Sequence, residues 1–195
     1  MKNIKRVAIT IFRSVKQFIP LKLLYLIQPL REFLYTFFYG PQIEMVLRPE
    51  IEIRLVSLLE GFEIKTFKEF PNKAMWLEMV SGSLGEWDEK SAEVFFFGDR
   101  AFDPEMCLFL MKDCTVVGTA SGQTQKNSGK VTGILHMVSV LPEYRGLGLG
   151  RQITLAVLHK LRKRFPDANI ILKTDSWRLP AINTYKEIGF SVYEN

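Results

Sequence analysis

The stretch from residue 134 to residue 154, ILHMVSVLPEYRGLGLGRQIT, constrains the fold of this chain more than any other. An apolar, β-branched run ends at Pro142, a turn follows with glycine at positions 146, 148 and 150, and a helical pattern then begins. Glycine lets a backbone approach a ligand closely, because it has no Cβ. A helix that begins here presents free N–H groups and the positive end of its dipole. The pattern therefore predicts a phosphate site.

Two familiar phosphate loops are excluded by the same residues. A Walker A loop requires Gly-Lys-Ser or Gly-Lys-Thr, which is absent, and a dinucleotide fingerprint requires glycine where Arg151 stands. The motif that remains is Arg-x-x-Gly-x-Gly, beginning at Arg145 and following a predicted strand.

Two segments of the chain resemble one protein family. Residues 138–150, VSVLPEYRGLGLG, resemble the acetyl-CoA signature of the GNAT N-acetyltransferases. Residues 179–190, LPAINTYKEIGF, are similar to the closing helix of that family, which carries a tyrosine and ends in Gly-Phe. The resemblance covers about residues 43–195, with its sharp matches within residues 134–190. It implies acetyl transfer from acetyl-CoA to a primary amine of a small molecule or peptide.

The resemblance also assigns residues to the cofactor. The pyrophosphate is expected on the backbone N–H groups of residues 146–151, with Arg145 and Arg151 as candidates for added charge, and the strand before the turn is expected to pair its backbone with the pantetheine arm. The cofactor-binding set is thus Val138, Ser139, Val140, Arg145, Gly146, Leu147, Gly148, Leu149, Gly150 and Arg151. The side chains of residues 138–140 are expected in the core, so their role should survive conservative substitution.

Two residues are candidates for catalysis. Tyr185 stands where many relatives carry a tyrosine near the sulfur, and a phenol can donate a proton as thiolate charge develops; the alternative is a ring that only packs under the sheet. Some relatives place a glutamate nine residues before the motif arginine, and this chain has His136 there. Histidine titrates near neutrality and is a candidate base, the alternative being a core histidine. Strand alternation predicts that His136 faces the same side as Val138 and Val140.

The chain departs from the family pattern at two places. Arg178 stands seven residues before Tyr185, where relatives often have asparagine, so contacts to the CoA arm are expected to differ. The sequence also stops soon after the Gly-Phe strand, where relatives usually continue into another strand. Either the sheet is one strand short or another segment covers its edge, the apolar N-terminal arm being a candidate. Acidic contributors to an acceptor pocket are sought among Glu63, Glu86 and Glu93.

Hydrophobic periodicity and turn residues predict a mixed α/β (α+β) domain, with a mostly antiparallel central sheet flanked by helices. The predicted strands are 61–67, 107–112, 115–122, 132–141, 169–174 and 190–193, and the predicted helices are 74–80, 90–97, one that begins after the glycine turn and ends before Pro166, and one that carries Tyr185. Gly118 in the second hairpin strand indicates a bulge or a close backbone approach.

Charge and cysteine content exclude several classes of protein. Residues 1–40 hold seven Lys and Arg residues and one acid, Glu32, whereas the remainder is near neutral, which is not the pattern of a nucleic-acid binder. Two cysteines and two histidines without a cluster predict neither a disulfide scaffold nor a metal site. We therefore expect reduced thiols in a cytoplasmic enzyme.

The chain is expected to divide into a basic amphipathic helical arm, residues 1–42, and an acetyltransferase domain, residues 43–195. Prolines at 20 and 29 divide the arm, apolar residues recur at helical spacing in its first piece, from Ile4 to Ile19, and no uncharged run is long enough to span a membrane. Three interpretations stay open: a helical layer on the body or across a homodimer interface, a peripheral contact with an anionic membrane, or an organelle presequence.

Two other functions are compatible with the sequence. The first is a CoA-binding module without catalysis, tethered to a membrane or a partner protein by its arm. The second is a nucleotide-binding domain unrelated to CoA, which would bind ATP or NAD more tightly than CoA.

Overall fold

The structure is a computed structural model that describes residues 41–81, 83–85 and 87–193. The described residues fall into two units: residues 41–43 with 174–179, and residues 44–173 with 180–193. All but the last two positions of the predicted arm lie outside the described residues, so the predictions for the arm stay untested.

After β1, which was not predicted, the strands and α-helices follow the predicted order. The described elements are β1 (Gln42–Leu47), β2 (Phe62–Thr66), α4 (Lys73–Val80), α5 (Glu89–Ala92), the π-helix η1 (Glu93–Phe97), β3 (Cys107–Lys112), β4 (Thr115–Asn127), β5 (Lys130–Val140), the 3₁₀ turn η2 (Pro142–Tyr144), α6 (Leu149–Arg164), β6 (Ile170–Asp175), α7 (Leu179–Ile188) and β7 (Ser191–Val192).

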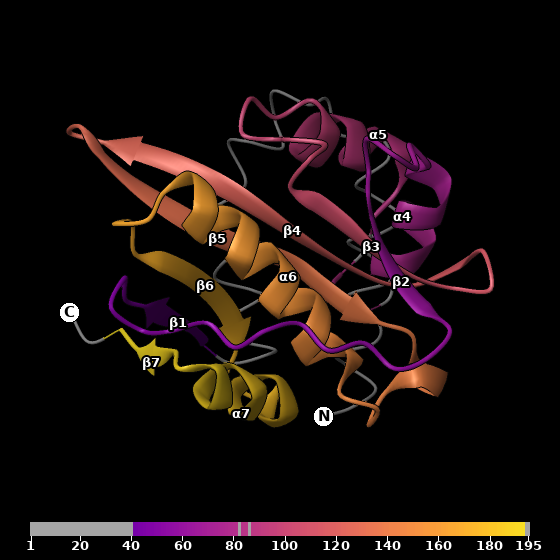
Figure 1. The fold of residues 1–195 in the computed structure, drawn as a ribbon. Helices are drawn as coiled ribbons and strands as arrows, with labels where there is room; N and C mark the ends of the chain where they lie inside the picture. The colour runs from indigo at the N-terminus through magenta and orange to yellow at the C-terminus, as the bar shows by residue number, and fades with distance from the viewer. Residues whose placement is uncertain (1–40, 82, 86, 194–195) are drawn as a thin grey trace, which may run out of the picture. The chain divides into compact units, whose positions relative to one another are not determined.

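Among the described residues the strands form one sheet in the order β2-β3-β4-β5-β6-β1-β7 (Figure 1). The strands from β2 to β5 pair antiparallel in sequence, β5 pairs parallel with β6, and β1 pairs antiparallel with β7. The expected mixed, mostly antiparallel sheet is confirmed. The expected irregularity at Gly118 is confirmed too, because the β3–β4 register shifts between Leu110, opposite Gly118, and Met111.

Local signals explain the helix boundaries. The Asn72 side chain accepts from the backbone N–H of Met75 and begins α4. Asp88 and Ser91 form a reciprocal capping box at the start of α5. α6 ends at Arg164, before Pro166, as predicted.

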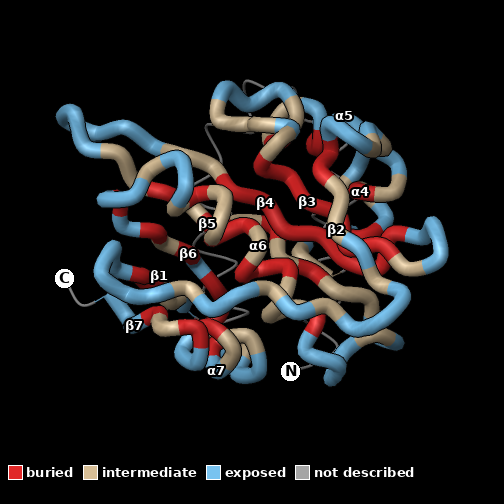
Figure 2. Tube along the Cα trace, in the orientation of Figure 1, coloured by how far each residue is buried: buried red, intermediate tan, exposed pale blue. Residues whose placement is uncertain are grey.

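Most residues of β3 and of the first part of β4 are buried (Figure 2). On one face α6 packs on β4 and β5, and a Cβ at Gly122 would lie 3.1 Å from both Val157 and Leu161. On the other face an aromatic cluster joins α4, η1, β3 and β5, with Trp76 stacked on Phe96 at 4.2 Å between ring centroids.

The first strand of the described chain was not predicted. The sequence pattern predicts the first strand at residues 61–67, but β1 precedes that strand and lies between β6 and β7. β1 pairs with β7 through Met45–Val192 and Val46–Ser191. The strand beside β7 therefore comes from the segment that precedes β2, and β7 is the last strand of the described sheet, so what covers its outer edge stays an open question. β7 itself is short and exposed.

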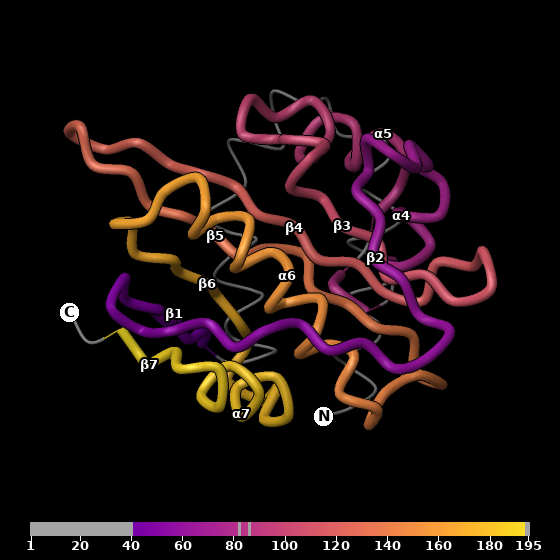
Figure 3. Tube along the Cα trace, viewed as in Figure 1, coloured from indigo at the N-terminus to yellow at the C-terminus, as the bar shows by residue number. Residues whose placement is uncertain are grey.

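Residues 48–61, which we call the crossing segment, carry the chain from β1 to β2 over α6 (Figure 3). The segment is mostly exposed and has little regular secondary structure. Three side chains of α6 hold its backbone: Gln152 accepts from Ser57 N–H at 2.7 Å, His159 Nε2 lies 2.9 Å from Arg54 O, and Arg162 donates to the carbonyl of residue 48 at 3.0 Å.

Candidate functional site

The glycine turn has the conformation that its residues predict. Gly146 and Gly148 have φ values of 79° and 73°, in the left-handed region that suits glycine. A Cβ at either position would meet nothing within 4 Å, so backbone conformation rather than space requires glycine there. Gly148 is the N-cap of α6 and provides no side chain to cap the helix.

The backbone N–H groups of residues 146–151 have no acceptor among the described residues. The bonds on either side of this run are Arg145 N–H to Pro142 O at 3.2 Å and Gln152 N–H to Gly148 O at 3.2 Å. A run of unpaired donors at the positive end of a sixteen-residue helix has the geometry that suits an anion, and its role as a binding site stays a prediction.

The two arginines that flank the turn are both engaged. Arg145 donates from Nε to Val140 O at 3.0 Å, which ties the turn to the end of β5. Arg151 forms an ion pair with Glu187 of α7 at 3.2 Å. Neither guanidinium is closed off from solvent. Both stand beside the unpaired N–H groups, as expected.

β5 and β6 pair over only part of their length. Their pairing consists of Gly133–Ile170 and Ile134–Ile171, whereas β5 continues to Val140 beside β4. The backbone edge of residues 135–140 that faces away from β4 therefore has no strand partner in the described sheet. This edge leads directly to the glycine turn.

A bulge in β5 overturns the predicted direction of His136. The β4–β5 register shifts between Thr119 and Ser121, and Met137 has a φ of 53°. The extra residue breaks the alternation. His136 lies against the Phe96 ring at 6.2 Å on the α4–η1 face, whereas the Val140 side chain faces Gly150 of α6. The expectation that His136 shares a face with Val140 was wrong, because alternation holds only without a bulge, and the expectation for Val138 stays a prediction.

His136 is half-buried and has an unsatisfied ring nitrogen. Nδ1 is fully enclosed and has no hydrogen-bond partner among the described residues. Burial lowers the pKa of His136 from its ordinary value, and the negative charge of Asp99 opposes that shift. The imidazole is therefore neutral at pH 7 and able to accept a proton.

Ser139 has a specific polar environment that the sequence did not indicate. Its buried hydroxyl donates to Met79 O at 3.1 Å and lies 2.8 Å from the Ser83 hydroxyl. It therefore joins β5 to the C-terminal end of α4. Ser139 is buried, as expected for a core side chain, and its two partners also bond each other, because Ser83 donates to Met79 O at 2.9 Å.

Tyr185 is buried in α7, and its ring contacts Phe190 edge-on at 5.9 Å between centroids. This places the phenol in the core side of the helix, as its amphipathic pattern indicates. Its role as a proton donor stays a prediction.

Two of the remaining candidate carboxylates form ion pairs on their own elements or with a neighbouring helix. Glu63 pairs with Lys65 at 2.9 Å and Glu93 with Lys73 at 2.6 Å, while Glu86 lies outside the described residues. In the smaller unit, Arg178 donates to Asp175 at 2.8 Å and stacks over its neighbour Trp177, so its side chain orders its own loop.

Both cysteines are free, as expected. Burial raises the pKa of Cys107 to about 12, so this thiol stays protonated at neutral pH, and Cys114 is exposed at the hairpin turn. Within residues 41–193, as far as they are described, no helix has the length and apolar character needed to cross a membrane.

A model of the acetyltransferase (GNAT) family matches residues 72–190. The chain belongs to this family. The match spans the aromatic face, the bulged strand, the glycine turn and the helix of Tyr185. The family expected from the two sequence segments is thereby confirmed.

Among curated proteins the chain is similar to mycothiol acetyltransferases. It is 28% identical to that of Thermomonospora curvata over 143 residues, covering 71% of this chain and 47% of that protein. It is 35% identical to that of Nocardia farcinica over 111 residues, covering 55% and 36%. The chain spans about half the length of the curated relatives that it matches first.

Solved structures share the fold. A GCN5-related N-acetyltransferase from Sphaerobacter thermophilus has a TM-score of 0.63 and 23% identity, covering 78% of this chain and 48% of that one. A chain of a NatC complex bound to Gag peptide and CoA has a TM-score of 0.59 and 17% identity, covering 69% and 87%.

Proposed function

We propose that this chain is an acetyl-CoA-dependent N-acetyltransferase that acts on a primary amine of a small molecule or peptide. The unpaired N–H groups of residues 146–151 at the start of α6 carry this proposal. Pyrophosphate is an anion with several acceptor oxygens and suits that run of donors. Membership in the GNAT family supports the choice of acetyl-CoA as the donor.

The residues present fit the donor along its length. The free edge of residues 135–140 offers backbone groups to the amide-containing pantetheine arm, in the manner of an added strand. This edge leads to the glycine turn, so one extended ligand can use both. Arg145 and Arg151 stand beside the turn, where positive charge favours phosphate.

Acetyl-CoA supplies an activated thioester, and the chain supplies the proton transfers. In the proposed mechanism the neutral His136 imidazole takes a proton from the attacking amine, directly or through water. The Tyr185 hydroxyl gives a proton to the departing thiolate. The residues at the bulge and in α7 thus act on opposite ends of the same transfer.

The first test is calorimetric titration with acetyl-CoA, followed by a free-thiol release assay across small amines and peptides. Binding with thiol release for at least one acceptor establishes the enzyme. Binding without release from any acceptor favours a non-catalytic CoA-binding module. Tighter binding of ATP or NAD than of CoA, or no binding of acetyl-CoA, overturns the proposal.

Tyr185→Phe separates catalysis from binding. Loss of the hydroxyl should lower kcat about 100-fold, the lower end of the usual contribution of a general acid, and leave the affinity for CoA unchanged. Unchanged kcat would remove Tyr185 from the mechanism without affecting the donor site.

We further propose that the basic arm expected at residues 1–42 ends where β1 begins, at Gln42, that it contacts a membrane surface or a second copy of the chain, and that the enzyme is cytoplasmic. The charge asymmetry of residues 1–40 supports the arm. Co-sedimentation with anionic liposomes, and sedimentation velocity, should differ between the full chain and a chain that begins at residue 41, just before β1. If the full chain and the shortened chain behave equally in both measurements, the proposal that the arm contacts a membrane or a second copy is wrong.

A further inference from the structure

Three side chains meet at the end of the sheet nearest the glycine turn. Phe62 and Lys112 are opposite each other in the β2–β3 pair. The Lys112 ammonium lies 5.3 Å from the centroid of the Phe62 ring and 5.6 Å from that of Tyr144. The two rings also contact each other edge-on, at 6.1 Å and an interplanar angle of 85°.

The rings are the main partners of this cation. All three residues are half-buried, and no carboxylate among the described residues forms an ion pair with Lys112. An ammonium within about 6 Å of an aromatic face is attracted by the ring quadrupole, and the attraction grows as water is removed. A lysine shared by two rings therefore favours one arrangement of the cluster.

Tyr144 connects the cluster to the anion site. It is the last residue of η2 and immediately precedes Arg145. η2 has no side-chain cap, and its backbone bonds are Tyr144 N–H to Leu141 O at 3.0 Å and Arg145 N–H to Pro142 O at 3.2 Å. The next residues have free N–H groups. A turn with so few internal bonds needs contacts from outside to keep one conformation.

We propose that Phe62, Lys112 and Tyr144 form a cation–π clamp that orders the turn before the glycines and thereby sets the affinity of the donor site. The clamp itself follows from the contacts in the structure, and its effect on the donor rests on the proposed function. Lys112 and Tyr144 are positioning residues: they hold the backbone that aims the donors of residues 146–151.

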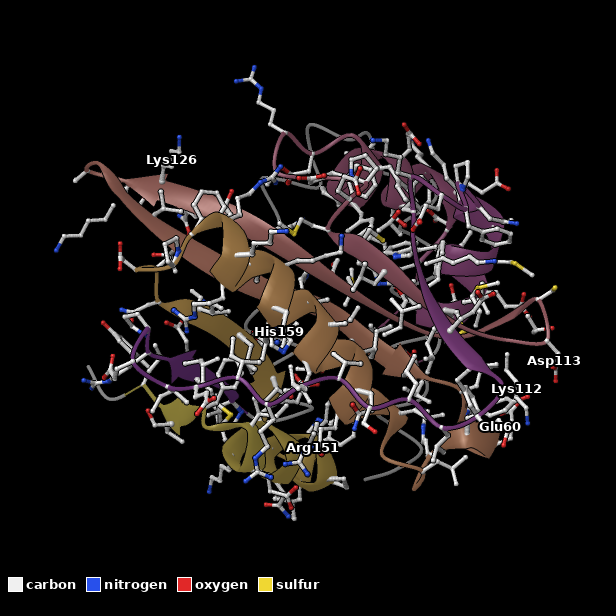
Figure 4. All side chains as sticks on the ribbon, in the orientation of Figure 1. Glu60, Lys112, Asp113, Lys126, Arg151 and His159 are labelled. Atoms are coloured by element: carbon white, nitrogen blue, oxygen red, sulfur yellow. The ribbon has the colours of Figure 1, made fainter. Side chains whose placement is uncertain are left out.

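Matched variants separate the clamp from simple charge. Lys112→Met keeps the apolar stem and removes the cation, while Lys112→Arg keeps a cation. Tyr144→Leu removes the ring, while Tyr144→Phe keeps it. Lys126→Met is the charge control, because Lys126 is exposed near the far end of β4 (Figure 4).

Two measurements are made on the full chain: amide hydrogen exchange at Tyr144 and Arg145 without ligand, and the Kd for CoA by calorimetry. Lys112→Met and Tyr144→Leu should each speed exchange at both amides and weaken CoA binding roughly three- to tenfold, the range of a partly buried cation–π contact. Lys112→Arg, Tyr144→Phe and Lys126→Met should match the wild type. In a thiol-release assay the KM for acetyl-CoA should rise while kcat is retained.

Unchanged exchange in Lys112→Met would overturn the clamp. Equal weakening of CoA binding by Lys112→Met and Lys126→Met would also overturn it, because net charge alone would then explain the effect. If the wild type does not bind CoA, the proposed function falls and with it the effect on the donor, whereas the exchange rates still decide whether the clamp orders the turn.

Discussion

The first turn of α6 and the outer face of the same helix treat polar groups in opposite ways. At the first turn the N–H groups of residues 146–151 have no acceptor among the described residues. On the outer face Gln152, His159 and Arg162 each bond to the backbone of the crossing segment. The first N–H groups of a helix have no acceptor within the helix, so under the proposed function they are available to the donor, whereas the bonds on the outer face stabilise the fold.

The two histidines repeat this contrast. His136, beside the bulge in β5, has an enclosed and unpaired ring nitrogen. His159 bonds to a carbonyl of the crossing segment. His136→Gln should lower kcat/KM about 100-fold because a general base is lost, whereas His159→Gln should stay close to the wild type. Thiol-release kinetics of the two variants check this. Equal losses of kcat/KM in the two variants would contradict the contrast between the histidines. A His136→Gln variant with wild-type kcat/KM would mean that another group is the base.

Gly148 sharpens the contrast at the first turn. Gly148→Val places a β-branched residue at a φ of 73° and should weaken CoA binding about 30-fold, since left-handed backbone is strained for such residues. The control is Gly129→Val at the β4–β5 hairpin tip, where φ is 80° and a Cβ also meets nothing within 4 Å. Both variants should lose similar stability. Calorimetry should show a loss of affinity only for Gly148→Val, and equal affinities would mean that the turn is not the donor site.

Arg162 tests the outer face. It donates to Pro166 O, Ala168 O and Arg48 O, each at 3.0 Å. Arg162→Met should lower the free energy of unfolding by about 2 kcal/mol, because hydrogen bonds from a charged group are lost, and should leave the Kd for CoA unchanged. Lys163→Met, at an exposed neighbour, should change stability by less than about 0.5 kcal/mol. Denaturant unfolding compares the free energies of unfolding of the two variants. Weaker CoA binding by Arg162→Met would mean that the outer face of α6 also supports the donor site, which would contradict the contrast.

The smallest expected effect is the pH dependence of stability. The pKa of His136 is lowered in the folded chain, so the unfolded chain binds more protons as pH falls below the ordinary histidine value of about 6.5. Stability should therefore be complete above that pH and decline below it, towards the lowered folded pKa. His136→Gln should flatten this part of the profile. A wild-type profile that rises on acidification would contradict the burial of His136.

Several features could be predicted from local residues alone. Pro142 and the glycines predict the break in the chain and the start of α6, because left-handed backbone and helix initiation depend on a few neighbouring residues. The hairpin at Asp113–Cys114 and the end of α6 before Pro166 follow from local rules in the same way. The family resemblance then predicted that the turn binds the pyrophosphate of acetyl-CoA.

Other features needed distant partners. Residues 42–47 form a strand because they pair with β7, which is distant in the sequence. A pattern of six residues is too short to predict that pairing. The bulge at Met137 depends on the fit of β5 against β4, and it reverses the side that alternation predicts for His136. The bonds of Ser139 and the rings around Lys112 join segments far apart in the chain.

The sequence by itself determined the glycine turn, the run of unpaired N–H groups that follows from it, and the family. These properties reside in backbone conformations that each short segment encodes. The tertiary structure alone decided which strand lies beside β7, which face His136 occupies and what holds Tyr144 in place. Those outcomes depend on competition among packing partners, which no local pattern contains.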